Sequence, residues 1–233
     1  MSILIEKYNL IKKSWRINKK KYINCNIKSM IELKSNGNNN ELAIIGFHGY
    51  GSNPYNMLEL LKALDIKEAD CFFPSGTISP FVNDELSKAW FSIPFTSDLN
   101  KEIAQSRDIV LPKLKYILNC YEKIVLLGFS QGAMMCLDIM LNLSKPVSGV
   151  VCLSGLNLSI DDKIKIDEKF LKIPIFVGHG INDEIIDINL SKKSFEIISK
   201  RGFVTNLNEY NMRHEVIDQE MQDIKNFIKK LLI

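Results

Sequence analysis

The sequence predicts a single-domain α/β fold, with a mostly parallel central sheet of about seven strands and helices on both of its faces. From residue 69 onwards, short apolar runs typical of buried strands mostly alternate with longer stretches of helical character. The chain has 233 residues, is 46% hydrophobic and contains no low-complexity linker, so it can build one large core. We therefore expect one domain over residues 1–233, with a core at 41–233 and a basic segment at 1–40 that includes the first strand.

The elements follow from apolar runs and from the turn residues between them. Strands are expected near residues 29–33, 42–47, 69–73, 124–127, 147–153, 173–177 and 203–210, and helices near 54–64, 99–120, 131–143, 189–201 and 215–232. The Asn-rich and Gly-containing turn at 36–40 favours an antiparallel hairpin of the first two strands at one edge of the sheet.

Three of the helices carry further signals. Asn53 and Pro54 supply an N-cap and a proline at the first helical position. Pro112 interrupts the stretch at 99–120, which predicts a kink or two separate helices. In the last helix, apolar residues recur at helical spacing, which predicts that it packs on the domain; they are Ile217, Met221, Ile224, Ile228 and Leu231.

The cysteines indicate the redox environment of the protein. Five of them are scattered along the chain without a Cys-x-x-Cys pair, which argues against a disulfide framework or a zinc site and favours a reducing cytoplasm. The first residues hold too short an apolar stretch for a secretory signal, and no later run approaches the length of a membrane span. We therefore expect a soluble, cytoplasmic protein.

The positive charge is concentrated at the front of the chain. Residues 1–40 contain nine Lys or Arg against Glu6 and Glu32. Six of the basic residues lie close together: Lys12, Lys13, Arg16, Lys19, Lys20 and Lys21. Because no aromatic-interleaved RNA motif accompanies them, a solvated basic surface is the favoured interpretation, with no nucleic-acid partner expected and peripheral membrane contact left open.

The stretch from Gly128 to Gly132 has the pattern Gly-x-Ser-x-Gly, between an apolar strand-like run and a helix-like segment. In a nucleophile elbow, a serine occupies a sharp turn from strand to helix, and its hydroxyl stands out above the sheet edge. Small residues are needed on either side because backbone crowds there. An ordinary turn would explain the two glycines but not the serine, so Ser130 is the candidate nucleophile.

A serine hydroxyl needs a base to remove its proton, and a carboxylate to orient that base. The chain has three histidines, His48, His179 and His214. Where a serine lies on such an elbow, the order along the chain is serine, acid, histidine. His48 and His179 precede the plausible acid, so His214, just after the last expected strand, is the candidate base.

The acid should follow a strand between Ser130 and His214. The expected strand at 173–177 leads directly into the segment that contains Asp183, which makes Asp183 the candidate. Glu184 and Asp187 lie close by in the chain, and spacing alone leaves them open.

Acyl transfer also requires N–H donors that point at the developing oxyanion. Gln131, directly after the serine, supplies one backbone N–H. The second should come from the loop after the strand at 42–47, and Tyr50 is the expected donor. We interpret His48 and His179 as structural histidines.

With these residues placed, the chain resembles the phospholipase/carboxylesterase family of α/β-hydrolases, which includes acyl-protein thioesterases and small bacterial carboxylesterases. The resemblance covers most of residues 41–230. It rests on seven motifs of the sequence: His48-Gly-Tyr-Gly-Ser52, Phe73-Pro74, Ala89-Trp-Phe91, Gly128-Phe-Ser-Gln-Gly-Ala133, Leu153-Ser-Gly155, His179-Gly-Ile-Asn-Asp-Glu-Ile-Ile186 and His214-Glu215.

The resemblance implies a triad of Ser130, Asp183 and His214, an oxyanion hole of the Tyr50 and Gln131 N–H groups, and no metal or organic cofactor. It also puts Trp90 and Phe91 near the acyl group of the substrate, although both could instead be core aromatics. Ser92 stands where the family commonly has Asp.

The leading hypothesis is a serine hydrolase that cleaves carboxylic esters through an acyl-enzyme, with a small acyl ester or thioester as substrate and a monomer or homodimer as the assembly. One alternative is a thioesterase that acts on S-acylated proteins. Another is a catalytically inactive hydrolase fold that serves as a binding protein. The sequence leaves the acyl chain length and the leaving group open.

Overall fold

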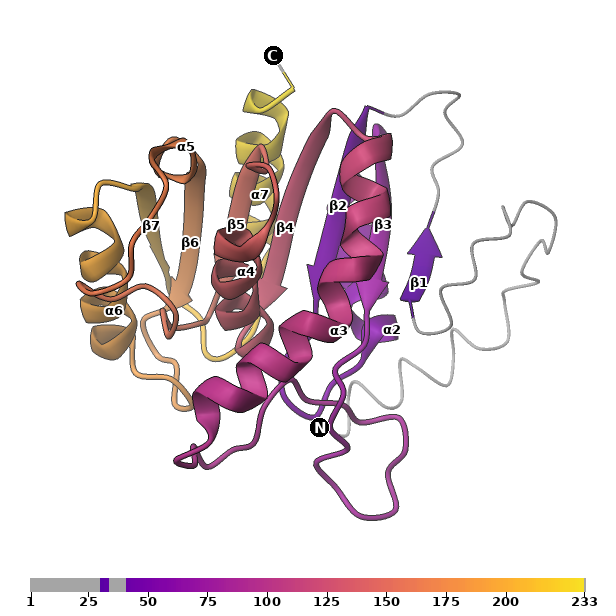
Figure 1. The fold of residues 1–233 in the computed structure, drawn as a ribbon, viewed down its shortest axis with the longest axis vertical. Helices are drawn as coiled ribbons and strands as arrows, with labels where there is room; N and C mark the ends of the chain where they lie inside the picture. The colour runs from indigo at the N-terminus through magenta and orange to yellow at the C-terminus, as the bar shows by residue number, and fades with distance from the viewer. Residues whose placement is uncertain (1–29, 34–40, 233) are drawn as a thin grey trace, which may run out of the picture.

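The computed structural model describes residues 30–33 and 41–232, which form a seven-stranded sheet flanked by helices (Figure 1). The strands are β1 (Met30–Leu33), β2 (Leu42–Phe47), β3 (Ala69–Pro74), β4 (Lys123–Phe129), β5 (Gly149–Leu153), β6 (Pro174–Gly180) and β7 (Val204–Tyr210), in the spatial order β1-β3-β2-β4-β5-β6-β7. The strands β2 to β7 are all parallel, and β1 runs antiparallel to β3. The predicted α/β fold with a mostly parallel sheet is confirmed.

The helices cover both faces of the sheet. They are α2 (Pro54–Leu64), α3 (Leu99–Cys120), α4 (Gln131–Asn142), the short α5 (Glu168–Leu171), α6 (Ile188–Lys200) and α7 (Asp218–Lys230). One apolar cluster joins α3, α4 and α6 to the near face of Figure 1, and another joins α2 and α7 to the far face. Among the described residues, no helix is long and apolar enough to cross a membrane.

The continuous apolar run in β4 follows from this layering. Ile124 and Leu126 belong to the cluster under α4, whereas Val125 and Leu127 belong to the cluster under α7. Because successive side chains of a strand point to opposite faces, a central strand covered on both sides needs an apolar residue at every position.

The predicted hairpin of the first two strands is wrong. β1 does lie at an edge of the sheet, but it pairs with β3, with Met30 opposite Pro74 and Leu33 opposite Cys71. All six residues of β2 are buried, and β2 lies between β3 and β4 with a parallel partner on each side. No edge of β2 is left for β1. The turn residues 36–40, like the basic residues between Lys12 and Lys21, lie outside the described residues.

Several helix boundaries are also informative. The Asn53 side chain accepts hydrogen bonds from the Tyr55 and Asn56 N–H groups, so the predicted N-cap of α2 is confirmed. α3 continues through Pro112 as one element, and its ribbon changes direction part-way along (Figure 1). α7 begins at Asp218, three residues after the predicted start, and α5 was not predicted.

α7 brings an unusual group into the core. Glu220, in its first turn, is fully buried, and among the described residues neither of its carboxyl oxygens has a hydrogen-bond partner. Its Oε1 lies against the backbone of Gly178 in β6, where a Cβ would overlap it. Burial, with a smaller contribution from the charge of Asp223, raises the pKa of Glu220 to about 8. The carboxyl group is therefore protonated at neutral pH.

The burial of Glu220 predicts a pH-dependent stability. An unfolded Glu loses its proton near pH 4.5, whereas the folded protein keeps it up to about pH 8, so the native state binds the extra proton between these values. The free energy of unfolding should therefore fall as the pH rises from about 4.5 to about 8, by about 1.4 kcal/mol for each unit of pKa difference. Glu220→Gln removes this titration.

Urea unfolding of wild type and Glu220→Gln across this pH range measures the effect. The stability of the variant relative to wild type should increase steadily with pH. A difference that is independent of pH would contradict a buried, neutral Glu220.

Candidate active site

Ser130 occupies the turn between β4 and α4, with φ 55° and ψ −118°. A positive φ is costly for a residue with a side chain, and such strain persists only where the surroundings enforce it. Here the Ser130 N–H donates to the Leu153 carbonyl at the end of β5, at 2.7 Å. The serine is partly exposed while its neighbours Gly128 and Gln131 are buried, as a nucleophile elbow requires.

Both glycines of the elbow are required by close approach of backbone. A Cβ at Gly132 would overlap the carbonyl oxygens of Phe47 and His48, where β2 ends. A Cβ at Gly128 would overlap the backbone of Gly132 and Ala133. The elbow can form only because the first turn of α4 passes directly over the ends of β2 and β4.

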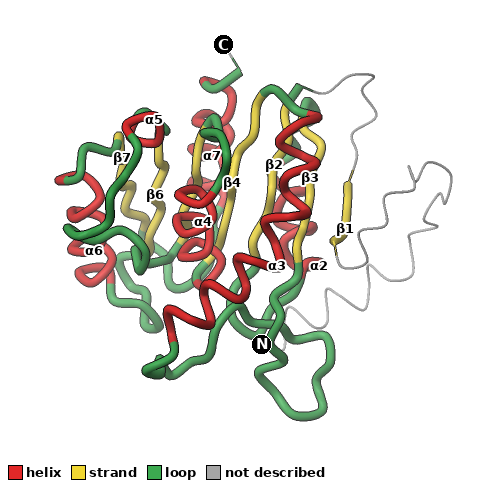
Figure 2. The backbone as a smooth tube through the Cα atoms, in the orientation of Figure 1, coloured by secondary structure: helices red, strands yellow, loops and turns green. Residues whose placement is uncertain are grey.

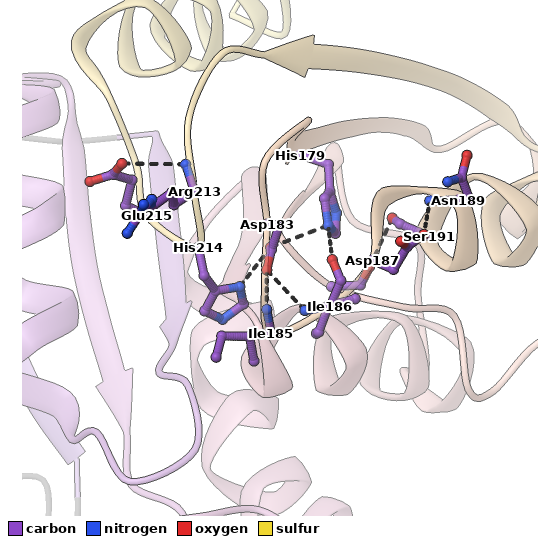
Figure 3. Close-up of polar contacts among 11 residues, drawn as sticks. His179, Asp183, Ile185, Ile186, Asp187, Asn189, Ser191, Arg213, His214 and Glu215 are labelled. Atoms are coloured by element: carbon purple, nitrogen blue, oxygen red, sulfur yellow. Dashed lines mark hydrogen bonds and ion pairs between the residues drawn. The ribbon is translucent and has the colours of Figure 1, made fainter.

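His214 and Asp183 form a direct hydrogen bond (Figure 3). The His214 Nδ1–H donates to Asp183 Oδ2 at 2.7 Å, and the Ile185 and Ile186 N–H groups donate to Oδ1 at 2.9 Å each. The Asp183 side chain is fully buried and that of His214 is 17% exposed. An oriented imidazole with one accessible edge is the arrangement expected of a general base.

Asp183 is held in its charged form. Burial alone would raise the pKa of Asp183, but hydrogen bonds from the Ile186 N–H, from His214 and from the Ile185 N–H together hold that pKa below its usual value. The carboxylate is therefore ionised at neutral pH and can stabilise an imidazolium at His214.

The loops that carry this pair meet because β6 and β7 are neighbours. The Ile181 N–H donates to the Tyr210 carbonyl at 2.8 Å, and the Asn182 N–H donates to the Met212 carbonyl at 3.1 Å. The chain after β7 thus crosses over the end of β6 before α7 begins, which brings His214 to Asp183.

The two alternative acids lie elsewhere. Asp187 caps α6 by accepting from the Asn189 N–H at 2.7 Å. Glu184 is 72% exposed and lies 3.8 Å from Arg213. Of the three acids, only Asp183 bonds to His214.

Among the described residues, no hydrogen bond joins Ser130 and His214, but His214 contacts the residue next to the serine. The His214 ring packs on Phe129, the residue before the serine, with ring centroids 4.9 Å apart. Catalytic hydrogen bonds in free enzymes are often long and tighten only when substrate binds.

The predicted oxyanion loop lies beside the serine. The loop after β2, residues 48–52, contacts the elbow directly, because a Cβ at Gly49 would be 3.5 Å from Ser130 Cβ. Tyr50 is the next residue of this loop. Gln131 is the first residue of α4, where helix geometry leaves the backbone N–H without a partner inside the helix. The positive end of the α4 dipole also faces Ser130.

His48 braces this loop, as the sequence predicted. Its Nδ1–H donates to the Gly49 carbonyl at 2.8 Å and its Nε2 accepts from the Gly76 N–H at 2.9 Å. Burial lowers the pKa of His48 to about 4, against the opposing effect of the bond to Gly49, so the ring is neutral. It therefore fixes two backbone segments without adding charge.

The side chain of Gln131 has a role that sequence reasoning missed. Its Oε1 accepts from the Trp90 N–H and its Nε2 donates to the Phe91 carbonyl, both at 2.7 Å. The Trp90 Nε1–H in turn donates to the His48 carbonyl at 2.8 Å. Trp90 thus joins the elbow to the oxyanion loop. The only signal in the sequence was a polar residue in the first turn of a mostly apolar helix.

Trp90 and Phe91 are both fully buried. In this conformation neither side chain offers surface to a substrate, and their contact with the acyl group stays a prediction. Exposed apolar side chains do lie further out on the same segment, among them Phe81 and Phe95. The Phe81 ring packs edge-on against Tyr50 at 5.9 Å. In residues 30–33 and 41–232, no three or more His, Cys, Asp or Glu side chains are arranged so that they could hold a metal ion together.

The model of the phospholipase/carboxylesterase family matches residues 28–232 of this sequence. The chain belongs to this family. Membership confirms the predicted α/β-hydrolase fold and the predicted class of enzyme, a serine hydrolase of ester or thioester bonds. The residues that carry the reaction, and the substrate, stay predictions.

Curated relatives within the family include fungal proteins. The acyl-protein thioesterase 1 of Candida albicans is 26% identical over 226 residues, which cover 88% of this chain and 98% of that protein. The acyl-protein thioesterase 1 of Debaryomyces hansenii is 36% identical over 114 residues, and this match spans about half of each protein, 48% of this chain and 49% of the relative.

Solved structures of family members share the fold. The acyl-protein thioesterase 2 of Zea mays has a TM-score of 0.75 at 20% identity, covering 88% of this chain and 99% of that one. The carboxylesterase of Bacillus cereus has a TM-score of 0.72 at 15% identity, covering 87% and 93%.

The close approach at the elbow predicts that Gly132→Ala is strongly destabilising. The added methyl group would overlap backbone oxygens, which cannot move without displacing β2, so we expect a loss of at least ~3 kcal/mol in the free energy of unfolding. Gly149→Ala is the matched control, because its new Cβ would meet only the ends of the Leu231 and Phe227 side chains. Equal stability of the two variants in urea unfolding would contradict the packing described.

The side chain of Gln131 can be tested separately. Gln131→Met keeps the length of the side chain but leaves the Trp90 N–H and the Phe91 carbonyl unpaired in the interior, which should cost roughly 2 kcal/mol or more. Urea unfolding and a red shift of tryptophan fluorescence measure the change. Gln222→Met, on the exposed face of α7, is the control and should alter the stability by less than ~0.5 kcal/mol. If Gln131→Met were as stable as wild type, the two hydrogen bonds of Gln131 would not hold the 89–91 segment in place.

Proposed function

We propose that this protein hydrolyses carboxylic esters, with Ser130 as nucleophile, His214 as general base and Asp183 as the acid that orients it. The observation that carries the proposal is the buried Asp183, bonded to His214, whose ring packs on Phe129, the residue directly before a strained and partly exposed serine. Strained backbone and buried charge both cost stability, and their coincidence at one edge of the sheet favours a catalytic role.

In the proposed reaction, His214 Nε2 takes the proton of the Ser130 hydroxyl as Oγ attacks the acyl carbonyl carbon. Asp183 holds the Nδ1–H of the same ring and stabilises the imidazolium that forms. The N–H groups of Tyr50 and Gln131 donate to the oxyanion. The imidazolium then protonates the leaving alcohol, and a water molecule, activated by His214, releases the acid from the acyl-enzyme.

The substrate is proposed to be a small ester or thioester with an apolar acyl group. The segment after β3 carries exposed apolar side chains, of which Phe81 packs on Tyr50 of the predicted oxyanion loop; they are Phe81, Val82, Leu86, Ile93 and Phe95. The Tyr50 hydroxyl donates to the Ile93 carbonyl at 3.5 Å, which ties this segment to the loop. Apolar surface near a polar reaction centre suits an acyl chain.

A thioesterase acting on S-acylated proteins is the second candidate. It is favoured by the relatives from Candida albicans and Debaryomyces hansenii, both named acyl-protein thioesterase 1. The same three residues would serve, since a thiol leaves in place of an alcohol. A catalytically inactive binding protein is disfavoured, because it would have no need of the strained serine.

We also propose a cytoplasmic location and a catalytic core at residues 41–233. The four cysteines among the described residues, Cys71, Cys120, Cys136 and Cys152, are all free, as suits a reducing compartment.

The decisive test compares wild type with Ser130→Ala on a chain-length series of esters and thioesters. Removal of the nucleophile should lower kcat roughly 10⁴-fold or more on every substrate that wild type cleaves. A fluorophosphonate probe should label wild type at Ser130 and leave the variant unlabelled. The ratio of ester to thioester turnover then separates the two candidate functions.

Ser199→Ala, at an exposed position on α6, is the matched control and should behave as wild type. Hydrolysis that survives Ser130→Ala, or folded wild type that takes up no probe, would overturn the proposed mechanism.

A further inference from the structure

Asp183 has a second histidine neighbour, which the proposed reaction does not use (Figure 3). His179, in β6, is fully buried. Its Nε2 lies 2.9 Å from the Ile186 carbonyl oxygen and 3.3 Å from Asp183 Oδ2. The ring therefore spans the turn that contains the proposed catalytic acid.

The neighbours of His179 decide where its proton lies. A carbonyl oxygen and an ionised carboxylate can only accept, so Nε2 must carry the hydrogen. Nδ1 is buried and has no hydrogen-bond partner among the described residues, so a second proton there would be an unsatisfied donor. Burial lowers the pKa of His179, and this outweighs the opposing effects of Ile186 and Asp183. His179 is thus neutral, and its single N–H donates to the Ile186 carbonyl while lying 3.3 Å from Asp183 Oδ2.

The carboxylate of Asp183 is held from both ends. Oδ1 accepts from two backbone N–H groups of its own turn, whereas Oδ2 faces His214 at 2.7 Å and His179 at 3.3 Å. His179 also bonds the carbonyl of Ile186, the residue whose N–H binds Oδ1. One imidazole thus closes the turn and limits rotation of the carboxylate within it.

We propose that His179 is a positioning residue: its Nε2–H, bonded to the Ile186 carbonyl and 3.3 Å from Asp183 Oδ2, keeps the Asp183 carboxylate in the orientation that His214 requires. This inference rests on the proposed function. Neutrality matters here, because a charged ring at this place would compete with the His214 imidazolium for the same oxygen.

Loss of the donor has two separable consequences. The carboxylate becomes less restricted, so fewer molecules present Oδ2 to His214 and kcat falls. The negative charge on Oδ2 is also shared with one donor fewer, so the His214 imidazolium is held more strongly. The acid limb of the pH–rate profile then moves to higher pH. A purely structural role would lower stability without moving the profile.

The experiment compares His179→Gln with His179→Leu on a small ester that wild type hydrolyses. The amide nitrogen of Gln can take the place of Nε2 and donate, whereas Leu fills the space without a donor. Val177→Ala, at a fully buried position on the same strand, is the control for lost packing. The measurements are kcat, KM and kcat/KM across pH, with urea unfolding of each variant.

We expect His179→Leu to lose about tenfold to a hundredfold in kcat, the range for loss of a donor that orients a charged group, with KM little changed and the acid limb at higher pH. His179→Gln should recover most of the lost kcat and have the acid limb of wild type. Val177→Ala should leave the pH–rate profile unchanged. The inference is overturned if Leu and Gln variants have the same kcat and profile, or if Val177→Ala reproduces the shift.

The two proposals fail in different ways. If wild-type hydrolysis does not depend on Ser130, the proposed function fails and the inference fails with it. If hydrolysis depends on Ser130 but is indifferent to the donor at position 179, only the inference fails. Should His179→Leu not fold, the comparison of His179→Gln with wild type still decides, since a Gln variant that folds but stays at a hundredth of wild-type kcat refutes rescue by the donor.

Discussion

The contact between Gly132 and the end of β2 is the constraint on which the rest of the site depends. Because the first turn of α4 lies directly on the Phe47 and His48 carbonyls, the chain must turn within one residue after β4, and Ser130 takes up the strain. The same contact brings the loop after β2 to the serine. The proposed nucleophile and both proposed oxyanion donors are thereby placed by the packing of three backbone segments rather than by flexible side chains.

Buried neutral polar groups then hold these segments together. Three such groups join the elbow, the 89–91 segment and the oxyanion loop: the Gln131 amide, the Trp90 indole and the His48 ring. Each of them forms its hydrogen bonds with backbone groups. His179 has the same character on the other side of the site. Neutral groups suit this purpose because they satisfy the interior without the desolvation cost of charge, which leaves Asp183 as the buried carboxylate beside His214.

Much of this could be predicted from the sequence. The order of Ser130, Asp183 and His214 along the chain, each after an expected strand, was enough to expect them at one edge of a parallel sheet. The pairing of β1 with β3 was not predictable from the turn at 36–40, because burial of β2 on both sides, not the local turn, decides which strand is left at the edge. The side-chain hydrogen bonds of Gln131 and His179 could not be predicted from the sequence either. The partners of Gln131 lie some forty residues away in the chain, and those of His179 depend on how one turn folds back on itself.

The segment between β3 and α3, which hangs below the sheet in Figure 2, differs in exposure along its length. Its inner part is clamped at Trp90 and Phe91, whereas its outer part exposes Val82 and Leu86. Substitutions in the outer part leave the hydrogen bonds of the inner part intact. Because exposed loops tolerate substitution, the outer part can therefore vary while the backbone framework around Ser130 stays the same.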